Sequence, residues 1–225
     1  AGCASGGITP ENVRAGTKGV EARFSSVDGL RDLFPGQDFQ LPVEITNNGA
    51  SDVPHGYFHI GLEKDVFETT APAVGVFNIP GRSVANPIPR TQTIRIPFTV
   101  RELQEQSQGI QSRITFTLCY PYDTVATLPV CIDPDIDNKE TQKPCTPKSI
   151  SFNGQGGPLA ITSIVPRMLS HNSRDRILPE FRITVANRGQ GLVVAPERVQ
   201  AFCSGGTVEP NYLNTAIVRV FIDED

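Results

Sequence analysis

The chain has 225 residues, which is enough for two domains of ordinary size with a core each. Its formal net charge of −4 and the lack of any Lys/Arg cluster argue against a nucleic-acid surface, and no apolar run approaches the ~20 residues of a transmembrane helix. The 20 glycines and 19 prolines are typical of many short strands joined by turns, so we expect an all-β fold.

Residues 1–18 are small, polar and rich in glycine, which predicts an extended N-terminal arm without a core of its own. Such an arm can lie on the sheet of a neighbouring copy, and we expect Ile8, Val13 and Val20 to be its subunit contacts. The opening Ala1-Gly2-Cys3 resembles the end of a bacterial-type lipoprotein signal, with Cys3 as the lipid anchor. The alternative is a chance cysteine in the arm.

Residues 19–144 predict a first immunoglobulin-like β-sandwich. Ile94, Ile96 and Phe98 alternate with polar residues or proline, as in a strand with one buried face. The proline-rich segment 66–90 predicts an irregular loop with one short strand at 74–77. The other expected strands are 20–24, 39–47, 57–62, 91–100, 113–122 and 125–132, and a short helical turn is expected within 101–112.

Residues 145–225 predict a second immunoglobulin-like β-sandwich, which follows a polar linker at 133–146. Its last expected strand, from Thr215 to Ile222, is strongly β-forming because it is rich in valine and isoleucine. The other expected strands are 149–152, 159–166, 180–186, 192–194 and 199–203. Regular short strands separated by turn signals are typical of a tandem of such sandwiches.

A repeated pattern supports the tandem arrangement. The segment 41–53 and the segment 181–193 both place alternating apolar residues before an Asn-x-Gly turn and a valine after it. Asn47 and Gly49 of the first copy match Asn187 and Gly189 of the second. Each copy therefore predicts a strand with one apolar face, a tight turn and the start of a partner strand.

Four cysteines predict two disulfides, which would place the chain in an oxidising, extracellular compartment. A hairpin turning near residues 124–126 would bring Cys119 opposite Cys131 on the outer face of a sheet. That pairing leaves Cys145 and Cys203 for each other. The alternative is a set of reduced thiols. A zinc site is not expected, because the sequence contains no Cys-x-x-Cys.

Three carboxylates alternate in the linker, at Asp133, Asp135 and Asp137. Oxygen-rich loops between extracellular β domains bind calcium, so these residues are candidate metal ligands. The spacing departs from the EF-hand pattern, since the sixth position is not glycine and the twelfth is Pro144. A solvated acidic linker is the alternative, and no other cofactor is expected.

The segment 34–49, Phe-Pro-Gly-Gln-Asp-Phe-Gln-Leu-Pro-Val-Glu-Ile-Thr-Asn-Asn-Gly, resembles the opening of a CARDB-type domain, a cell-adhesion-related immunoglobulin-like module of prokaryotic surface proteins. A wider pattern is similar to a group of secreted archaeal proteins. It comprises Cys119-Tyr-Pro-Tyr122, Val130-Cys-Ile-Asp133, Cys145, Gly154-Gln-Gly-Gly-Pro158 and Cys203. The resemblance implies an exported, non-enzymatic surface or filament protein and brings no catalytic residues with it.

Two functions of different class follow. The first is a structural subunit of a cell-surface filament, such as a pilus, or of a coat, which assembles as a homopolymer through its β domains and its N-terminal arm. The alternative is an adhesion or ligand-binding module anchored by a lipid on Cys3. Catalysis is not expected, because the sequence has no Gly-x-Ser-x-Gly, no His-Glu-x-x-His and no phosphate-binding loop ahead of a helix.

Overall fold

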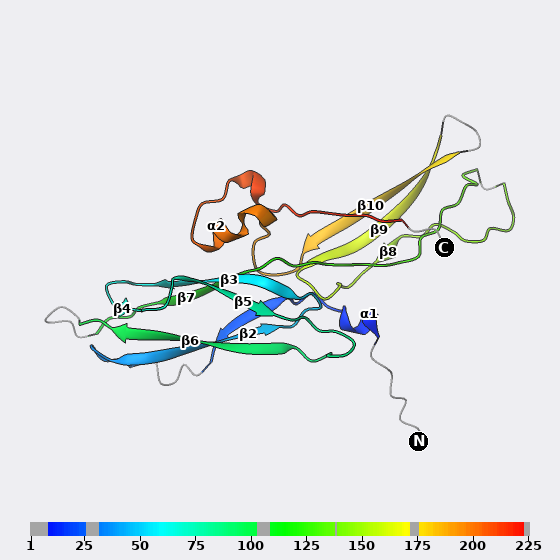
Figure 1. Cartoon of the computed structure of the whole chain (residues 1–225). Helices are drawn as coiled ribbons and strands as arrows, with labels where there is room; N and C mark the ends of the chain where they lie inside the picture. The colour runs from blue at the N-terminus through cyan, green and yellow to red at the C-terminus, as the bar shows by residue number, and fades with distance from the viewer. Residues whose placement is uncertain (1–8, 26–31, 103–108, 138, 172–175, 223–225) are drawn as a thin grey trace, which may run out of the picture.

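The computed structural model describes residues 9–25, 32–102, 109–137, 139–171 and 176–222. These residues form three antiparallel sheets with a few short helical turns, so the all-β prediction is confirmed (Figure 1). The strands are β1 (Val20–Phe24), β2 (Asp38–Asn47), β3 (Val53–Leu62), β4 (Phe67–Glu68), β5 (Val74–Ile79), β6 (Arg90–Val100), β7 (Ile114–Cys119), β8 (Ile150–Ser151), β9 (Leu159–Ser170) and β10 (Ile177–Asn187). The helices are α1 (Pro10–Val13) and α2 (Val199–Cys203), with 3-10 turns at Pro196–Arg198 and Pro210–Tyr212.

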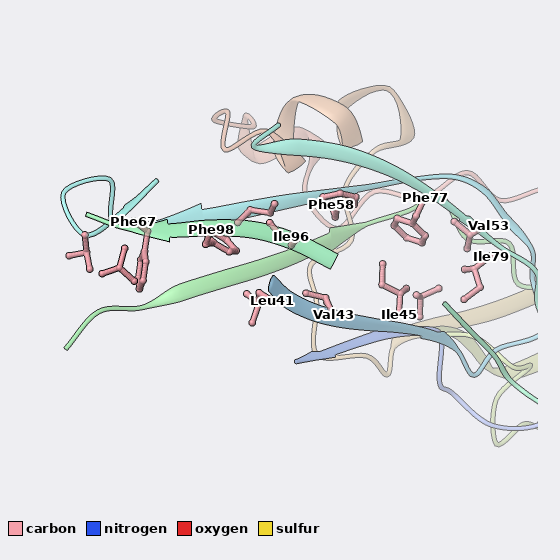
Figure 2. Packing of buried hydrophobic residues seen from close by; sticks show 14 residues of the cluster. Leu41, Val43, Ile45, Val53, Phe58, Phe67, Phe77, Ile79, Ile96 and Phe98 are labelled. Atoms are coloured by element: carbon pink, nitrogen blue, oxygen red, sulfur yellow. The ribbon is translucent and has the colours of Figure 1, made fainter. Parts of the chain in front are cut away.

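Two of the sheets pack face to face as a sandwich. One has the strand order β1-β2-β6-β4 and the other β5-β3-β7. Alternation along β2 places Leu41, Val43 and Ile45 in the space between them, where they meet Ile96 and Phe98 of β6 (Figure 2). Burying each such side chain contributes about 1.5–3 kcal/mol, so this cluster is the main apolar stabilisation of the fold.

The third sheet has the order β10-β9-β8, and no other described sheet packs against it. Its burial is correspondingly poor. Ala160 and Ile164 are buried, whereas Leu178 and Val185 are 55% and 39% exposed. The second complete sandwich therefore stays a prediction, since the described residues form one sheet in that part of the chain.

Four expected strands do not form. Residues 125–132 are extended but join no ladder, and of 192–194 only Val194 forms a bridge, with Leu213. Residues 199–203 form α2, which follows the turn begun by Pro196. Residues 215–222 pair with no strand. The helical turn expected within 101–112 falls mostly on 103–108, outside the described residues. Each of these four segments has local β propensity, but among the described residues none has a partner strand that pairs along its length.

Candidate functional site

A disulfide closes the loop that joins the sandwich to the third sheet. It links Cys131 to Cys145, whose Cα atoms lie 5.8 Å apart. The expected pairings of Cys131 with Cys119 and of Cys145 with Cys203 are therefore wrong. The reason is that residues 120–132 run on as an extended segment after β7 and do not fold back as a hairpin.

A lysine neutralises the carboxylates that we expected to bind calcium. The Lys143 ammonium lies 2.6 Å from Asp133 Oδ2 and 3.3 Å from Asp135 Oδ2. Backbone N–H groups donate to the remaining oxygens: that of Asp135 to Asp133, and those of Lys139 and Glu140 to Asp135. Asp137 turns instead to the Lys139 ammonium, 2.8 Å away. The three carboxylates do not converge as a calcium site. The positive charge that Asp133 and Asp135 face is the Lys143 ammonium.

These contacts hold both aspartate pKa values below their ordinary range. For Asp133 the main cause is the hydrogen bond from Lys143, and for Asp135 it is the backbone N–H groups of Glu140 and Lys139. A carboxyl whose pKa falls on folding stabilises the fold above its unfolded pKa of about 3.9. That stabilisation is lost as the pH falls through the lower, folded value.

Replacing Lys143 with methionine is therefore expected to change the pKa of Asp133 more than the pKa of Asp135. The pKa of Asp133 should rise toward its ordinary value, while that of Asp135 should move less because its donors are mainly backbone groups. NMR titration of the two side-chain carboxyl carbons measures both midpoints. Equal midpoints for Asp133 in the variant and the wild type would contradict the ion pair.

The N-terminal residues do not form a free arm where the structure describes them. Val13 and Val20 are 5% and 7% exposed and are buried within their own chain, so neither side chain is presented to a neighbour. The Ala15 carbonyl accepts a hydrogen bond from Arg82, and the Gly16 carbonyl accepts one from the Gly156 N–H. Ile8 and Cys3 lie outside the described residues.

The repeated pattern builds the same turn twice. In the first copy the Asn47 side chain accepts from the Gly49 N–H at 3.0 Å and donates to the Ser51 carbonyl at 2.8 Å. In the second copy Asn187 makes the matching bonds, with the Gly189 N–H at 3.0 Å and the Gly191 carbonyl at 2.8 Å. The asparagine is thus required in each copy because its amide satisfies a donor and an acceptor of the turn.

The strand before each turn also has an equivalent partner. Val20, the first residue of β1, pairs with Asn47, and Leu159, the first residue of β9, pairs with Asn187. The residue after each asparagine then donates its N–H to the residue before that partner strand: Asn48 to Gly19 and Arg188 to Pro158. The β1–β2 pair and the β9–β10 pair are therefore the same unit used twice.

Both turns converge on the loop 154–158. The first turn contacts it through the Ala50 N–H, which donates to the Gly156 carbonyl at 2.9 Å, and the second contacts Pro158. Gln155 is 8% exposed and secures the loop to β9 through two bonds of 2.9 Å with the Ile161 backbone. We call this meeting point of residues 16–20, 47–51, 120–122 and 154–158 the junction.

Two tyrosines fix the junction from the segment after β7. The Tyr120 hydroxyl accepts from the Val20 N–H and donates to the Val20 carbonyl, at 3.1 and 3.2 Å. The Tyr122 hydroxyl accepts from the Ser51 N–H at 3.2 Å and donates to the Gly156 carbonyl at 2.5 Å. Burial raises the pKa of both phenols, so they stay protonated and able to donate. The sequence pattern singled out these tyrosines, but only the structure shows which backbone groups they join.

Cys119 and Cys203 are both buried, and neither forms a disulfide. Cys119 points away from the sandwich core, as the alternation along β7 requires, and α2 covers it there. Elsewhere the described residues contain no cluster of three His, Cys, Asp or Glu side chains suited to a metal ion. None of their helices has the length and apolar character needed to cross a membrane.

The fold and the junction define the class: a disulfide-bearing all-β chain in which buried polar groups join two copies of one strand–turn unit. Comparison of the sequence with protein-family models, curated proteins and solved structures gave no match.

Proposed function

We propose that this chain is a non-enzymatic structural subunit of an extracellular filament or coat, in which one copy adds a strand to the third sheet of the next. The observation that carries the proposal is a strand-forming segment, residues 215–222, that pairs with no strand among the described residues. The proposal keeps the assembly inferred from the sequence but moves the joining strand from the N-terminal arm to the C-terminal segment.

The third sheet offers the edge that such a strand needs. In the first unit β2 pairs with β1 on one side and with β6 on the other. In the second unit β10 pairs with β9 alone and forms the edge of its sheet. The position equivalent to β6 is open among the described residues, and the free N–H and C=O groups of an edge strand readily pair with another chain.

The segment 215–222 has the properties of the missing strand. Five of its side chains are apolar and 58–87% exposed: Ile217, Val218, Val220, Phe221 and Ile222. Its Val218-Arg219-Val220 matches the Ile94-Arg95-Ile96 of β6 in type. Arg219 is its one charged residue, and β10 carries Glu180, of opposite charge, as well as Arg182, of like charge. Exposed β-branched residues of this kind are unfavourable in a lone chain and mark an interaction surface.

The Cys131–Cys145 disulfide supports an extracellular location, because such bonds persist in oxidising compartments. The abundance of strands agrees with a structural role. In strand addition each copy binds one partner through its C-terminal segment and another through its third sheet. Such head-to-tail contacts produce a filament unless the subunits close into a ring.

Self-association of the full chain tests the proposal. We expect the wild type to form species whose mass grows with concentration, measured by light scattering and electron microscopy. Val220→Asp should weaken association at least about tenfold, because strand addition would bury the carboxylate. Ile88→Asp is the matched control, since Ile88 is 76% exposed in a loop, and it should associate like the wild type.

Two results would count against the proposal. One is equal association of both variants and the wild type. The other is a monomer at every concentration whose β10 amides are protected from exchange, which would mean that residues 215–222 pair with their own β10. A monomer that carries a lipid adduct on Cys3 would favour the anchored adhesion module instead.

A further inference from the structure

The two unbonded cysteines lie against each other, although they are far apart in the sequence. Cys119 ends β7 and Cys203 ends α2, and they are 9% and 2% exposed. α2 packs against β7, so the two buried side chains lie at the same contact, where each thiol shifts the pKa of the other. Figure 1 shows α2 over the sheet of β3 and β7, on the side away from β2 and β6.

We infer that Cys119 and Cys203 form a second disulfide when the protein is oxidised. Two buried cysteines at the contact of packed elements can be bridged once their Cα atoms are within about 4.4–6.8 Å of each other. The chain already contains one disulfide, so the compartment that oxidises Cys131 and Cys145 also provides the conditions for this pair. This inference concerns a bond within one copy and does not depend on assembly.

The chemistry requires an acceptor for two electrons. The Cys203 thiolate attacks a disulfide oxidant and forms a mixed disulfide, and the oxidant releases its first sulfur as a thiolate that takes up a proton. The Cys119 sulfur, after losing its proton, then attacks the Cys203 sulfur and displaces the second sulfur of the oxidant. Two cysteine thiols are oxidised and one disulfide is reduced to two thiols, so atoms and electrons balance.

The order of attack follows from the environment of each sulfur. The hydrogen bond between them lowers the pKa of Cys203 and raises that of Cys119, so Cys203 loses its proton first. Both groups are buried, so α2 must lift from the sheet to admit the oxidant. Once formed, the bond holds α2 on β7 and ties the segment after the third sheet to the sandwich.

Peptide mapping of the full chain tests the inference. The protein is exposed to oxidised glutathione, its free thiols are alkylated under denaturing conditions, and it is digested without reduction. We expect one linked pair of peptides that contains Cys119 and Cys203 and another that contains Cys131 and Cys145. Alkylation of Cys119 and Cys203 in chains whose 131–145 bond has formed would overturn the inference, as would a bond from either to Cys3.

A second measurement follows the opening of α2 itself. Hydrogen exchange of the α2 amides is compared before and after mild reduction that leaves the Cys131–Cys145 bond intact. We expect oxidation to slow exchange in α2 at least about tenfold, because a cross-link restricts its local opening. Cys203→Ser is the control and should show no dependence on oxidation. Equal exchange in the oxidised and reduced wild type would contradict the bond.

Discussion

Replacing Gly49 with alanine is expected to lower the free energy of unfolding by about 3 kcal/mol. A Cβ atom at this position would lie 2.6 Å from the Gly156 carbonyl oxygen and 2.7 Å from that of Lys18, and it would overlap the Tyr122 hydroxyl. Two of these obstacles are backbone atoms held in the junction, so they cannot move aside as a flexible side chain would. The added methyl group must therefore separate the turn from the loop 154–158.

Urea unfolding followed by circular dichroism measures this effect, since the chain has no tryptophan. Gly191→Ala is the matched control, because nothing lies within 4 Å of a Cβ at Gly191. It should change stability by no more than about 0.5 kcal/mol. If the two variants unfold at the same urea concentration, the junction does not stabilise the fold as described.

A double variant identifies the contact responsible. Tyr122→Phe removes the hydroxyl that Gly49→Ala would meet, and it also removes the bonds to Ser51 and Gly156. Because both changes act on the same contact, their combined cost should be smaller than the sum of the separate costs. Strict additivity would place the strain on the backbone oxygens alone.

The sequence predicts the sandwich well because its signals are local. Alternation within β2 and within β6 is visible in the residues of each strand, and their burial follows directly from it. The turn after β2 is also encoded mainly by nearby residues, since Asn47 bonds to Gly49 and Ser51, within four positions of itself, and makes one longer bond to the Ile79 carbonyl. These features need little knowledge of distant contacts.

The disulfides and the acidic loop could not be predicted in the same way. Pairing Cys119 with Cys131 required a hairpin, but the residue types in 120–132 do not distinguish a turn from a continuous extended segment. Lys143 pairs with Asp133 inside the loop that the Cys131–Cys145 disulfide closes, and the sequence does not indicate that pairing of the cysteines. Likewise, α2 has β-forming valine and phenylalanine, yet its helix covers Cys119, a contact set by tertiary packing.

Equivalent positions of the repeat should differ greatly in their effect on stability. Ile45 is fully buried between two sheets, whereas its counterpart Val185 is 39% exposed on a sheet that no other described sheet covers. Ile45→Ala should therefore lower the free energy of unfolding of the isolated chain by about 2–5 kcal/mol, and Val185→Ala should lower it by about 1 kcal/mol or less. Urea unfolding at a concentration below that of self-association provides the comparison.

Val43→Ala controls for chemistry, because it removes the same atoms as Val185→Ala from a side chain with 0% exposure. It should cost clearly more than Val185→Ala, since it leaves a cavity in a packed core where the exposed site leaves none. Equal costs for the two valine variants would mean that the third sheet is covered in the isolated chain. That result would concern the face of the third sheet, whereas the edge of β10 offers backbone groups in the plane of the sheet, so strand addition is tested separately by self-association.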